Sequence, residues 1–125
     1  MLDLYCGAGS IGISFLKKGL GSRVVGIEIV EDAITDARHN AKINGVEDQC
    51  VFLASSAEKA FAQHPELYEK LQDLELVIVD PPRDGMHPSM IDFLQKLRLD
   101  HAFKLLYISC NPVTMARDIQ LLHQI

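Results

Sequence analysis

Three short segments of the sequence combine residue types that could hold a nucleoside and carry out chemistry on it. The first, Tyr5–Gly12, reads YCGAGSIG and contains Gly7, Gly9 and Gly12. Glycine allows a tight turn and close backbone approach to a ligand, and a helix that starts after such a turn offers free N–H donors. Glu28 ends the next apolar run, at the position where an acid accepts hydrogen bonds from ribose hydroxyls. The pairing predicts a site for a nucleoside cofactor.

The identity of that cofactor is left open by the glycines. Their spacing also satisfies the G-x-G-x-x-G pattern of NAD-binding domains. Asp3, just before the loop, favours S-adenosylmethionine, because a carboxylate attracts an ammonium or sulfonium group and repels a pyrophosphate. The alternative for Asp3 is a hydrogen bond that organises the loop, and the alternative for the whole segment is a structural turn.

The second segment, Asp80–Gly85, reads DPPRDG and follows an apolar run. Its two prolines make the chain rigid at this point. Methylases that act on exocyclic amino groups carry an aromatic residue after the second proline, and Arg83 in that position argues against this activity. Arg83 could hold a carboxylate, a phosphate or a base carbonyl. The alternative is an ion pair with Asp80 or Asp84.

The third segment, Ser109–Pro112, reads SCNP and opens a predicted helix. Asn111 suits the N-cap and Pro112 the first helical position. Cys110 therefore lies just ahead of a helix N-terminus, where the partial positive charge favours the thiolate. We interpret Cys110 as a nucleophile, against the alternative of a small buried apolar side chain.

The composition is that of one globular domain. The chain has 125 residues, of which 48% are hydrophobic and 23% charged, and this excludes extensive disorder. No apolar run is long enough for a transmembrane helix, and the first residues lack the pattern of a signal peptide. The unpatterned Cys6, Cys50 and Cys110 argue against disulfides and for a reduced, cytoplasmic protein. We expect Cys6 and Cys50 to be buried, and the five scattered histidines predict no metal site.

The net charge of −5 does not indicate a nucleic-acid-binding surface, which should be basic. If the protein acts on nucleic acid, most of the electrostatic attraction must come from elsewhere. Both ends of the sequence look cut, because the first predicted strand begins almost at residue 1 and residue 125 lies within or just past a helix. We therefore expect a piece of a longer protein.

Apolar runs alternate with segments of helical periodicity along the chain. The predicted strands are Leu2–Tyr5, Arg23–Glu28, Cys50–Leu53, Leu74–Val79 and Lys104–Ser109. The predicted helices cover about 10–19, 30–43 and 89–98, and a last helix runs from Pro112 onward. Residues about 57–72 are predicted to be mostly helical despite Pro65. This alternation predicts one α/β domain over residues 1–125, a parallel sheet with helices on both faces. The three segments would then meet at the carboxyl edge of the sheet, where such folds bind ligands.

The motifs and their order resemble those of the S-adenosylmethionine-dependent RNA uracil-5 methyltransferases that act on tRNA and 23S rRNA. The resemblance runs over nearly all 125 residues through DLYCGAGSIG, GIE, DPPR and SCNP, and the last is followed by Thr114, Ala116, Arg117 and Asp118. It implies a Rossmann-like class I methyltransferase fold, truncated at both ends, with S-adenosyl-L-methionine as cofactor. It also implies RNA, either rRNA or tRNA, as the partner of the full-length protein, and no membrane association.

The resemblance also implies roles for individual residues. Cys110 is the nucleophile that adds to carbon 6 of uracil, and the base that later removes the proton from carbon 5 is a glutamate beyond residue 125. By the same resemblance Tyr5, Ser10, Glu28, Ser56 and Asp80 are cofactor contacts. From the motifs themselves, we expect Gly7 and Gly9 to contact the cofactor as well, and Arg83 and Asn111 to contact the substrate.

Truncation has two expected consequences. Without the general base and the RNA-binding domain, the chain should not catalyse repeated rounds of RNA methylation. With Lys104–Ser109 at a sheet edge beside apolar side chains, it should associate with itself or be a marginally stable monomer. Two other functions remain open, an NAD-dependent oxidoreductase domain and a non-catalytic cofactor-binding or interaction module.

Overall fold

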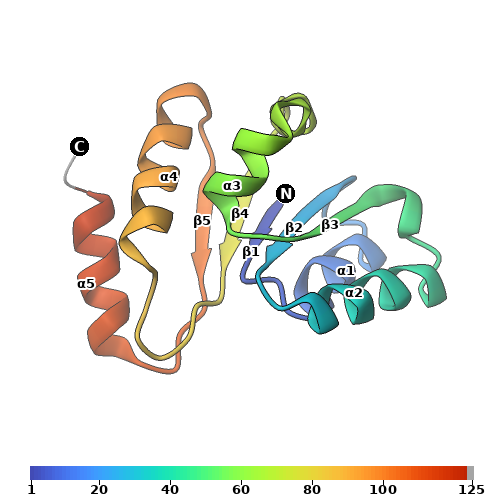
Figure 1. Cartoon of the computed structure of the whole chain (residues 1–125), viewed down its shortest axis with the longest axis horizontal. Helices are drawn as coiled ribbons and strands as arrows, with labels where there is room; N and C mark the ends of the chain where they lie inside the picture. Colours follow the sequence, from blue (N-terminus) through green and yellow to red (C-terminus); the bar gives the residue numbers. More distant parts are fainter. Residues whose placement is uncertain (124–125) are drawn as a thin grey trace.

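A computed structural model describes residues 1–123 of the chain, and in them strands and helices alternate (Figure 1). The strands are β1 (Leu2–Leu4), β2 (Val24–Glu28), β3 (Cys50–Ala54), β4 (Leu76–Val79) and β5 (Lys104–Tyr107). The α-helices are α1 (Ser10–Lys17), α2 (Glu31–Ile43), α3 (Ala57–Gln63), α4 (Pro88–Asp100) and α5 (Pro112–Leu122). Two 3-10 helices, η1 (Glu47–Gln49) and η2 (Pro65–Leu71), complete the set.

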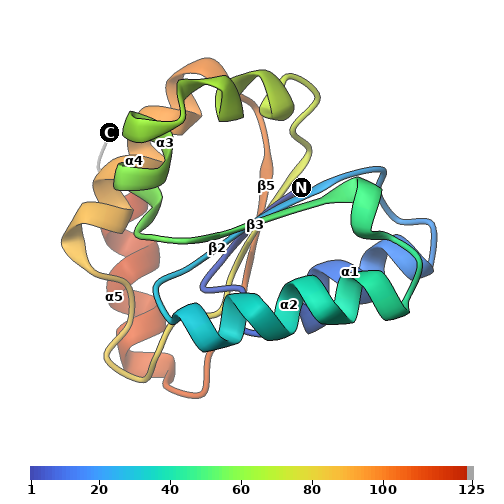
Figure 2. The same ribbon diagram turned by 45° about the vertical axis from the view of Figure 1, so that its right-hand side comes forward.

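The strands form one parallel sheet in the order β3-β2-β1-β4-β5. Helices α1 and α2 cover one face, and α3, α4 and α5 cover the other (Figure 2). The predicted α/β class is therefore confirmed. The chain order reverses between β1 and β4, and the carboxyl ends of these two strands form the crevice in which such sheets bind ligands.

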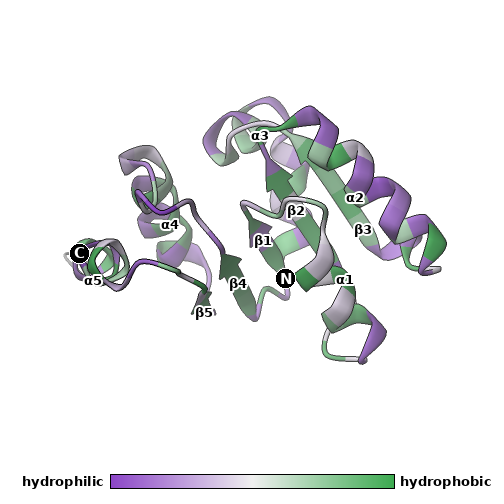
Figure 3. Cartoon of the chain, turned by 90° about the horizontal axis from the view of Figure 1, so that it is seen from below, coloured by the Kyte–Doolittle hydropathy of each residue, from purple (hydrophilic) through white to green (hydrophobic). Residues whose placement is uncertain are grey.

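Each face of the sheet has its own apolar core. Leu2, Leu4 and Val79 are completely buried against α3 and α4, while Val24 and Phe52 pack against α1 and α2. The strands are hydrophobic almost throughout, and α2 carries a hydrophilic outer surface (Figure 3). Burial on both faces explains why β4 reads as an unbroken apolar run rather than an alternating one.

Residues 57–72 are mostly helical, as predicted, but they form two helices rather than one. Helix α3 ends at Gln63, and Pro65–Leu71 form the 3-10 helix η2. Proline has no N–H to donate and excludes the α conformation from the residue before it. His64 accordingly has φ −129° and ψ 69°.

The last strand is shorter than the predicted Lys104–Ser109, since β5 ends at Tyr107. The N–H of Ile108 still donates a bond of 2.8 Å to the Val79 carbonyl on β4. Strand β5 lies at an edge of the sheet, as expected, with Leu105 36% and Leu106 37% exposed. Across residues 1–123, no helix combines the length and the apolar character that crossing a bilayer requires.

Candidate functional site

The glycine loop leaves β1 through a run of left-handed backbone. Tyr5 has φ +58°, Gly7 +54° and Gly9 +80°. A Cβ on Gly9 would lie 2.9 Å from the Phe52 ring, so this glycine lets the loop pack on the sheet. A Cβ on Gly7 would meet nothing within 4 Å, so the backbone at Gly7 is open to a ligand. The two predicted loop glycines thus serve different purposes.

Glu28 lies directly against this loop, as predicted. Its Oε1 accepts a hydrogen bond of 3.2 Å from the Gly7 N–H, and its Oε2 accepts one of 3.3 Å from the Val30 N–H. Two backbone bonds hold the carboxylate at the carboxyl end of β2. Each oxygen keeps acceptor capacity for a further donor, such as a ribose hydroxyl.

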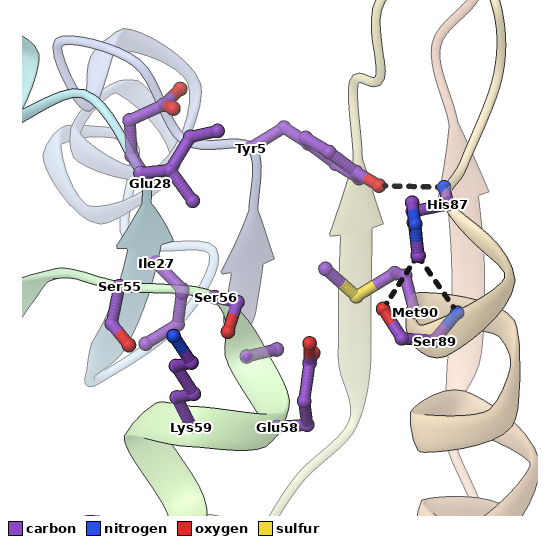
Figure 4. A pocket seen from close by; sticks show the side chains of 12 residues that line it. Tyr5, Ile27, Glu28, Ser55, Ser56, Glu58, Lys59, His87, Ser89 and Met90 are labelled. Carbon is purple, nitrogen blue, oxygen red and sulfur yellow. Dashed lines mark hydrogen bonds between the residues drawn. The ribbon is translucent and has the colours of Figure 1, made fainter.

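A pocket of about 370 Å³ opens beside Glu28 (Figure 4). Its lining combines an apolar base with a few polar groups, as in small-molecule sites. It is formed by Tyr5, Ile27, Glu28, Ile29, Ser55, Ser56, Ala57, Glu58, Lys59, His87, Ser89 and Met90. Tyr5, Glu28 and Ser56, all predicted cofactor residues, come together here.

Ser56 carries an unsatisfied polar atom in this pocket. Its Oγ is buried and has no hydrogen-bond partner among the described residues, although Ser56 stands at the N-cap of α3. A buried unpaired hydroxyl costs about 1–3 kcal/mol. A ligand that bonds to this oxygen would recover that cost.

Tyr5 connects this pocket with a second one of about 600 Å³, lined also by Pro82, Gly85 and Arg117. The Tyr5 hydroxyl accepts a hydrogen bond of 3.4 Å from the His87 N–H at the start of α4 (Figure 4). The end of β1 is thereby tied to the loop that follows β4.

Four predicted cofactor residues, Gly7, Gly9, Ser10 and Asp80, do not line the pocket beside Glu28. Ser10 is the exposed first residue of α1, and it borders a separate hollow with Lys17 and Asn40. Asp80 is exposed at the end of β4 and does not line that pocket. The turn at Gly9 directs α1 toward α2, and this carries Ser10 away.

Asp3 is almost fully buried, at 1% exposure, so it does not lie open beside the loop. Burial raises the pKa of Asp3 to about 7; the Gly12 N–H lowers it, and the charges of Asp80 and Glu28 add to the rise. The negative charges of Asp80 and Glu28 therefore act on Asp3 at the start of the loop. The loop N–H groups of Gly7 and Gly9 also bond within the protein, to Glu28 and to the Cys6 carbonyl. This environment favours a cationic ligand over a pyrophosphate.

Cys110 lies at the N-terminus of α5 and is exposed. The predicted cap is confirmed, because Asn111 accepts a bond of 3.1 Å from the Val113 N–H and Pro112 opens the helix. Cys6 is buried and Cys50 half-buried, and burial raises the pKa of both thiols. Cys110 is the exposed one of the three cysteines.

Arg83 does not pair with either neighbouring acid among residues 1–123. Its Nη1 lies 3.9 Å from the Cys110 Sγ, while its carbonyl accepts bonds from Asn111 Nδ2 at 3.1 Å and Thr114 Oγ1 at 2.9 Å. A guanidinium beside a sulfur stabilises the thiolate form. The Asn111 amide is used to join α5 to the loop after β4, so its first role is structural.

Sequence reasoning assigned no role to Thr114, Arg117 and Asp118, yet all three bond to the segment Arg83–Met86. Their spacing of three and four residues, which places side chains on one helix face, was the available signal. In the described part of the chain, no three His, Cys, Asp or Glu side chains converge as a metal site would require.

Comparisons with known proteins point in one direction. A family model described as tRNA (Uracil-5-)-methyltransferase matches residues 1–125. An uncharacterized RNA methyltransferase of Enterococcus faecalis is 38% identical over 122 residues, which are 98% of this chain and 25% of that protein. Another, from Caldanaerobacter subterraneus, is 39% identical over 97% of this chain and 24% of that protein. The chain spans about a quarter of the length of these curated relatives.

Solved structures show the same fold. An RNA methyltransferase from Salinibacter ruber in complex with S-adenosyl-L-homocysteine is 25% identical, with a TM-score of 0.56 over 85% of this chain and 61% of that one. A putative rRNA-methylase from Clostridium thermocellum is 17% identical, with a TM-score of 0.62 over 99% of this chain and 70% of that one. At this identity the second likeness concerns the fold alone.

Proposed function

Because the chain belongs to the tRNA (uracil-5-)-methyltransferase family, we propose that it is the cofactor-binding and nucleophile-bearing part of an enzyme that methylates carbon 5 of uridine in tRNA or rRNA. The observation that carries the proposal is the pairing of Arg83 with the exposed Cys110 at 3.9 Å. This pair lies at the same carboxyl edge of the sheet as the glycine loop and Glu28.

S-adenosyl-L-methionine is the cofactor that suits the residues around the glycine loop. Glu28 would hold the ribose hydroxyls, and the unpaired Ser56 hydroxyl would bond to the nucleoside in the same pocket. Asp3, Glu28 and Asp80 make the loop acidic, which suits an ammonium and a sulfonium group. The Salinibacter ruber structure, which is similar to this chain, is a complex with S-adenosyl-L-homocysteine. The cofactor supplies an electrophilic methyl group on its sulfonium.

Cys110 makes carbon 5 of uracil reactive. This carbon is a poor nucleophile until the Cys110 thiolate adds to carbon 6, forming an S–C bond and pushing the electron pair of the double bond toward carbon 5 as an enolate. Arg83 stabilises the thiolate before the attack. After carbon 5 is methylated, a base removes its remaining proton, the double bond re-forms, and the sulfur leaves as thiolate.

We propose that the base is a glutamate beyond residue 125 and that the RNA-binding surface also lies outside this sequence. The net charge of −5 accords with this, because phosphate-binding surfaces are basic. The isolated chain should therefore bind cofactor without completing repeated turnovers, in a cytoplasmic enzyme whose full length carries the remaining parts.

Trapping on 5-fluorouridine RNA tests the nucleophile. Fluorine at carbon 5 cannot leave as a proton, so the adduct between Cys110 and carbon 6 persists once methylation has occurred. With the full-length enzyme and S-adenosyl-L-methionine, we expect a covalent protein–RNA species whose cross-linked peptide contains Cys110. Cys110→Ser should form none, and Cys50→Ser is the matched control that should form it normally. An adduct on another residue would overturn the assignment.

Calorimetry on this chain tests the cofactor independently of RNA. We expect heat with S-adenosyl-L-homocysteine and none with NAD. Glu28→Gln keeps the shape and removes the charge, so affinity should fall by about 1.5–3 kcal/mol, the range for hydrogen bonds to a charged group. Binding of NAD instead, or equal affinity in Glu28→Gln, would contradict the assigned site.

A further inference from the structure

One face of α5 is bonded to the loop that carries Arg83. Thr114 Oγ1 donates to the Arg83 carbonyl at 2.9 Å, Arg117 Nη2 donates to the Asp84 carbonyl at 2.9 Å, and Asp118 Oδ2 accepts from the Met86 N–H at 2.8 Å. These residues lie three and four positions apart, on one face of the helix, so each can bond to a different residue of the loop. We call Thr114, Arg117 and Asp118 the α5 clamp.

Asp118 anchors the clamp. It is fully buried, and its Oδ2 also accepts from the Tyr107 hydroxyl while its Oδ1 accepts from Arg117 at 2.9 Å. Burial alone raises the pKa of Asp118, but the bonds from Tyr107, the Met86 N–H and Arg117 outweigh it, and the pKa lies below its ordinary value. The anchor therefore remains charged at neutral pH.

The loop has a shape that allows this close approach. Gly85 has φ +83°, and a Cβ there would lie 2.6 Å from Asp118 Oδ2. A side chain at Gly85 would push the loop away from the clamp. The loop and the helix are therefore fitted to each other over Arg83–Met86.

The clamp acts where the nucleophile is. Arg83 is exposed and has no ion-pair partner in residues 1–123, so an unattached loop would let its guanidinium sample many positions. The bond from Thr114 fixes the Arg83 backbone to the first turn of the helix that Cys110 precedes. The backbone of Arg83 and the residue Cys110 are then joined through the same helix terminus.

We propose that the α5 clamp positions the Arg83 guanidinium against the Cys110 sulfur and so maintains the reactivity of that thiol. Thr114, Arg117 and Asp118 are positioning residues that act through Arg83. The inference rests on the proposed function, in which Cys110 is the nucleophile.

A double-mutant cycle tests the clamp. The rate of Cys110 alkylation by iodoacetamide is measured between pH 5 and pH 9, by mass spectrometry of each cysteine-containing peptide. At pH 7, Arg83→Gln should slow the alkylation of Cys110 by roughly tenfold, because the sulfur loses the guanidinium that lies 3.9 Å from it. Thr114→Val should slow it by about threefold and shift the pH profile in the same direction. The double variant should be no slower than Arg83→Gln alone.

The outcomes separate positioning from stability. Thr35→Val is the matched control, because Thr35 on α2 makes the same kind of bond, to the Glu31 carbonyl at 3.2 Å, far from Cys110 in the fold. It should leave the alkylation rate unchanged. The clamp would be overturned if Thr114→Val were alkylated as fast as the original chain. It would also be overturned if the effects of Thr114→Val and Arg83→Gln multiplied in the double variant.

A second variant, Asp118→Asn, tests the role of Asp118, and the adduct assay on 5-fluorouridine RNA tests the proposed function separately. Asp118→Asn should slow alkylation like Thr114→Val if circular dichroism shows it folded; if it is unfolded, the Thr114 cycle decides alone. Alkylation needs neither cofactor nor RNA. If the double variant is no slower than Arg83→Gln but no adduct forms on 5-fluorouridine RNA, the proposed function is refuted and the clamp is not. If the adduct forms but the effects of Thr114→Val and Arg83→Gln multiply, the clamp is refuted and the proposed function is not.

Discussion

Replacing Asp3 by Asn should stabilise this protein at pH 8 and change it little at pH 4. Asp3 is 1% exposed, and its Oδ2 has no hydrogen-bond partner in the described residues. Burial raises its pKa to about 7 from an ordinary value of 3.8. The difference is roughly three pKa units at about 1.4 kcal/mol each, so ionised Asp3 costs the folded state about 4 kcal/mol.

The sign follows from proton binding. Between pH 4 and pH 7 the folded state holds a proton on Asp3 that the unfolded state has lost, so stability falls as pH rises and levels off above pH 7. Asn keeps the shape and has no charge to bury. Because the amide must itself find partners, we expect a gain of about 1–3 kcal/mol at pH 8.

Thermal denaturation at pH 4, 6 and 8 measures this. For a chain of this length each kcal/mol corresponds to roughly 4 °C in Tm, so the Asn variant should melt about 4–12 °C higher at pH 8. Asp36→Asn, an exposed site on α2, is the matched control and should change Tm little at any pH. A buried charge at Asp3 would be refuted if the difference in Tm between the Asn variant and the original chain were the same at pH 4 and pH 8. It would also be refuted if the Asn variant were less stable at pH 8.

Three further outcomes follow from the fold. Gly9→Ala should lower the free energy of unfolding in urea by about 2–4 kcal/mol, because a Cβ at φ +80° is strained and would lie 2.9 Å from the Phe52 ring; an unchanged urea midpoint would contradict this. The exposed edge strand β5 should make the chain self-associate, seen as a rise in light scattering with concentration; Leu105→Lys should reduce it while Leu99→Lys on α4 does not, and a monomer throughout would refute it. Cys110 should be alkylated before the two other cysteines in the folded chain, and equal rates would show that it is not exposed.

Much of the local structure could be predicted from the sequence, because it depends on neighbouring residues. The alternation of apolar runs and helical periods predicted the parallel sheet, and the SCNP segment predicted the cap of α5. The glycine loop and Glu28 also met as expected, since both follow strands that pair side by side. The helical character of residues 57–72 was predicted in the same way, and the break at Pro65 follows from the geometry that proline imposes on His64.

The tertiary structure alone decided which charged groups have partners. Local spacing placed Arg83 beside Asp80 and Asp84, whereas the pairing of β4 with β5 brought it to Cys110. The tertiary structure also placed Ser10 in a hollow separate from the pocket beside Glu28. Strand order and the packing of a helix on a loop join residues that are far apart in the chain, and no local period encodes these contacts.

Burial is the second property that local sequence did not supply. Asp3 looks like a loop residue in the sequence, and Asp118 looks like one more polar residue on a surface helix, yet both are almost completely buried. They differ in what surrounds them. Asp118 receives bonds from Tyr107, Met86 and Arg117, so its pKa falls, while desolvation dominates at Asp3 and its pKa rises to about 7. A buried carboxylate takes its charge state from the donors that the fold brings to it, and these come from distant parts of the chain.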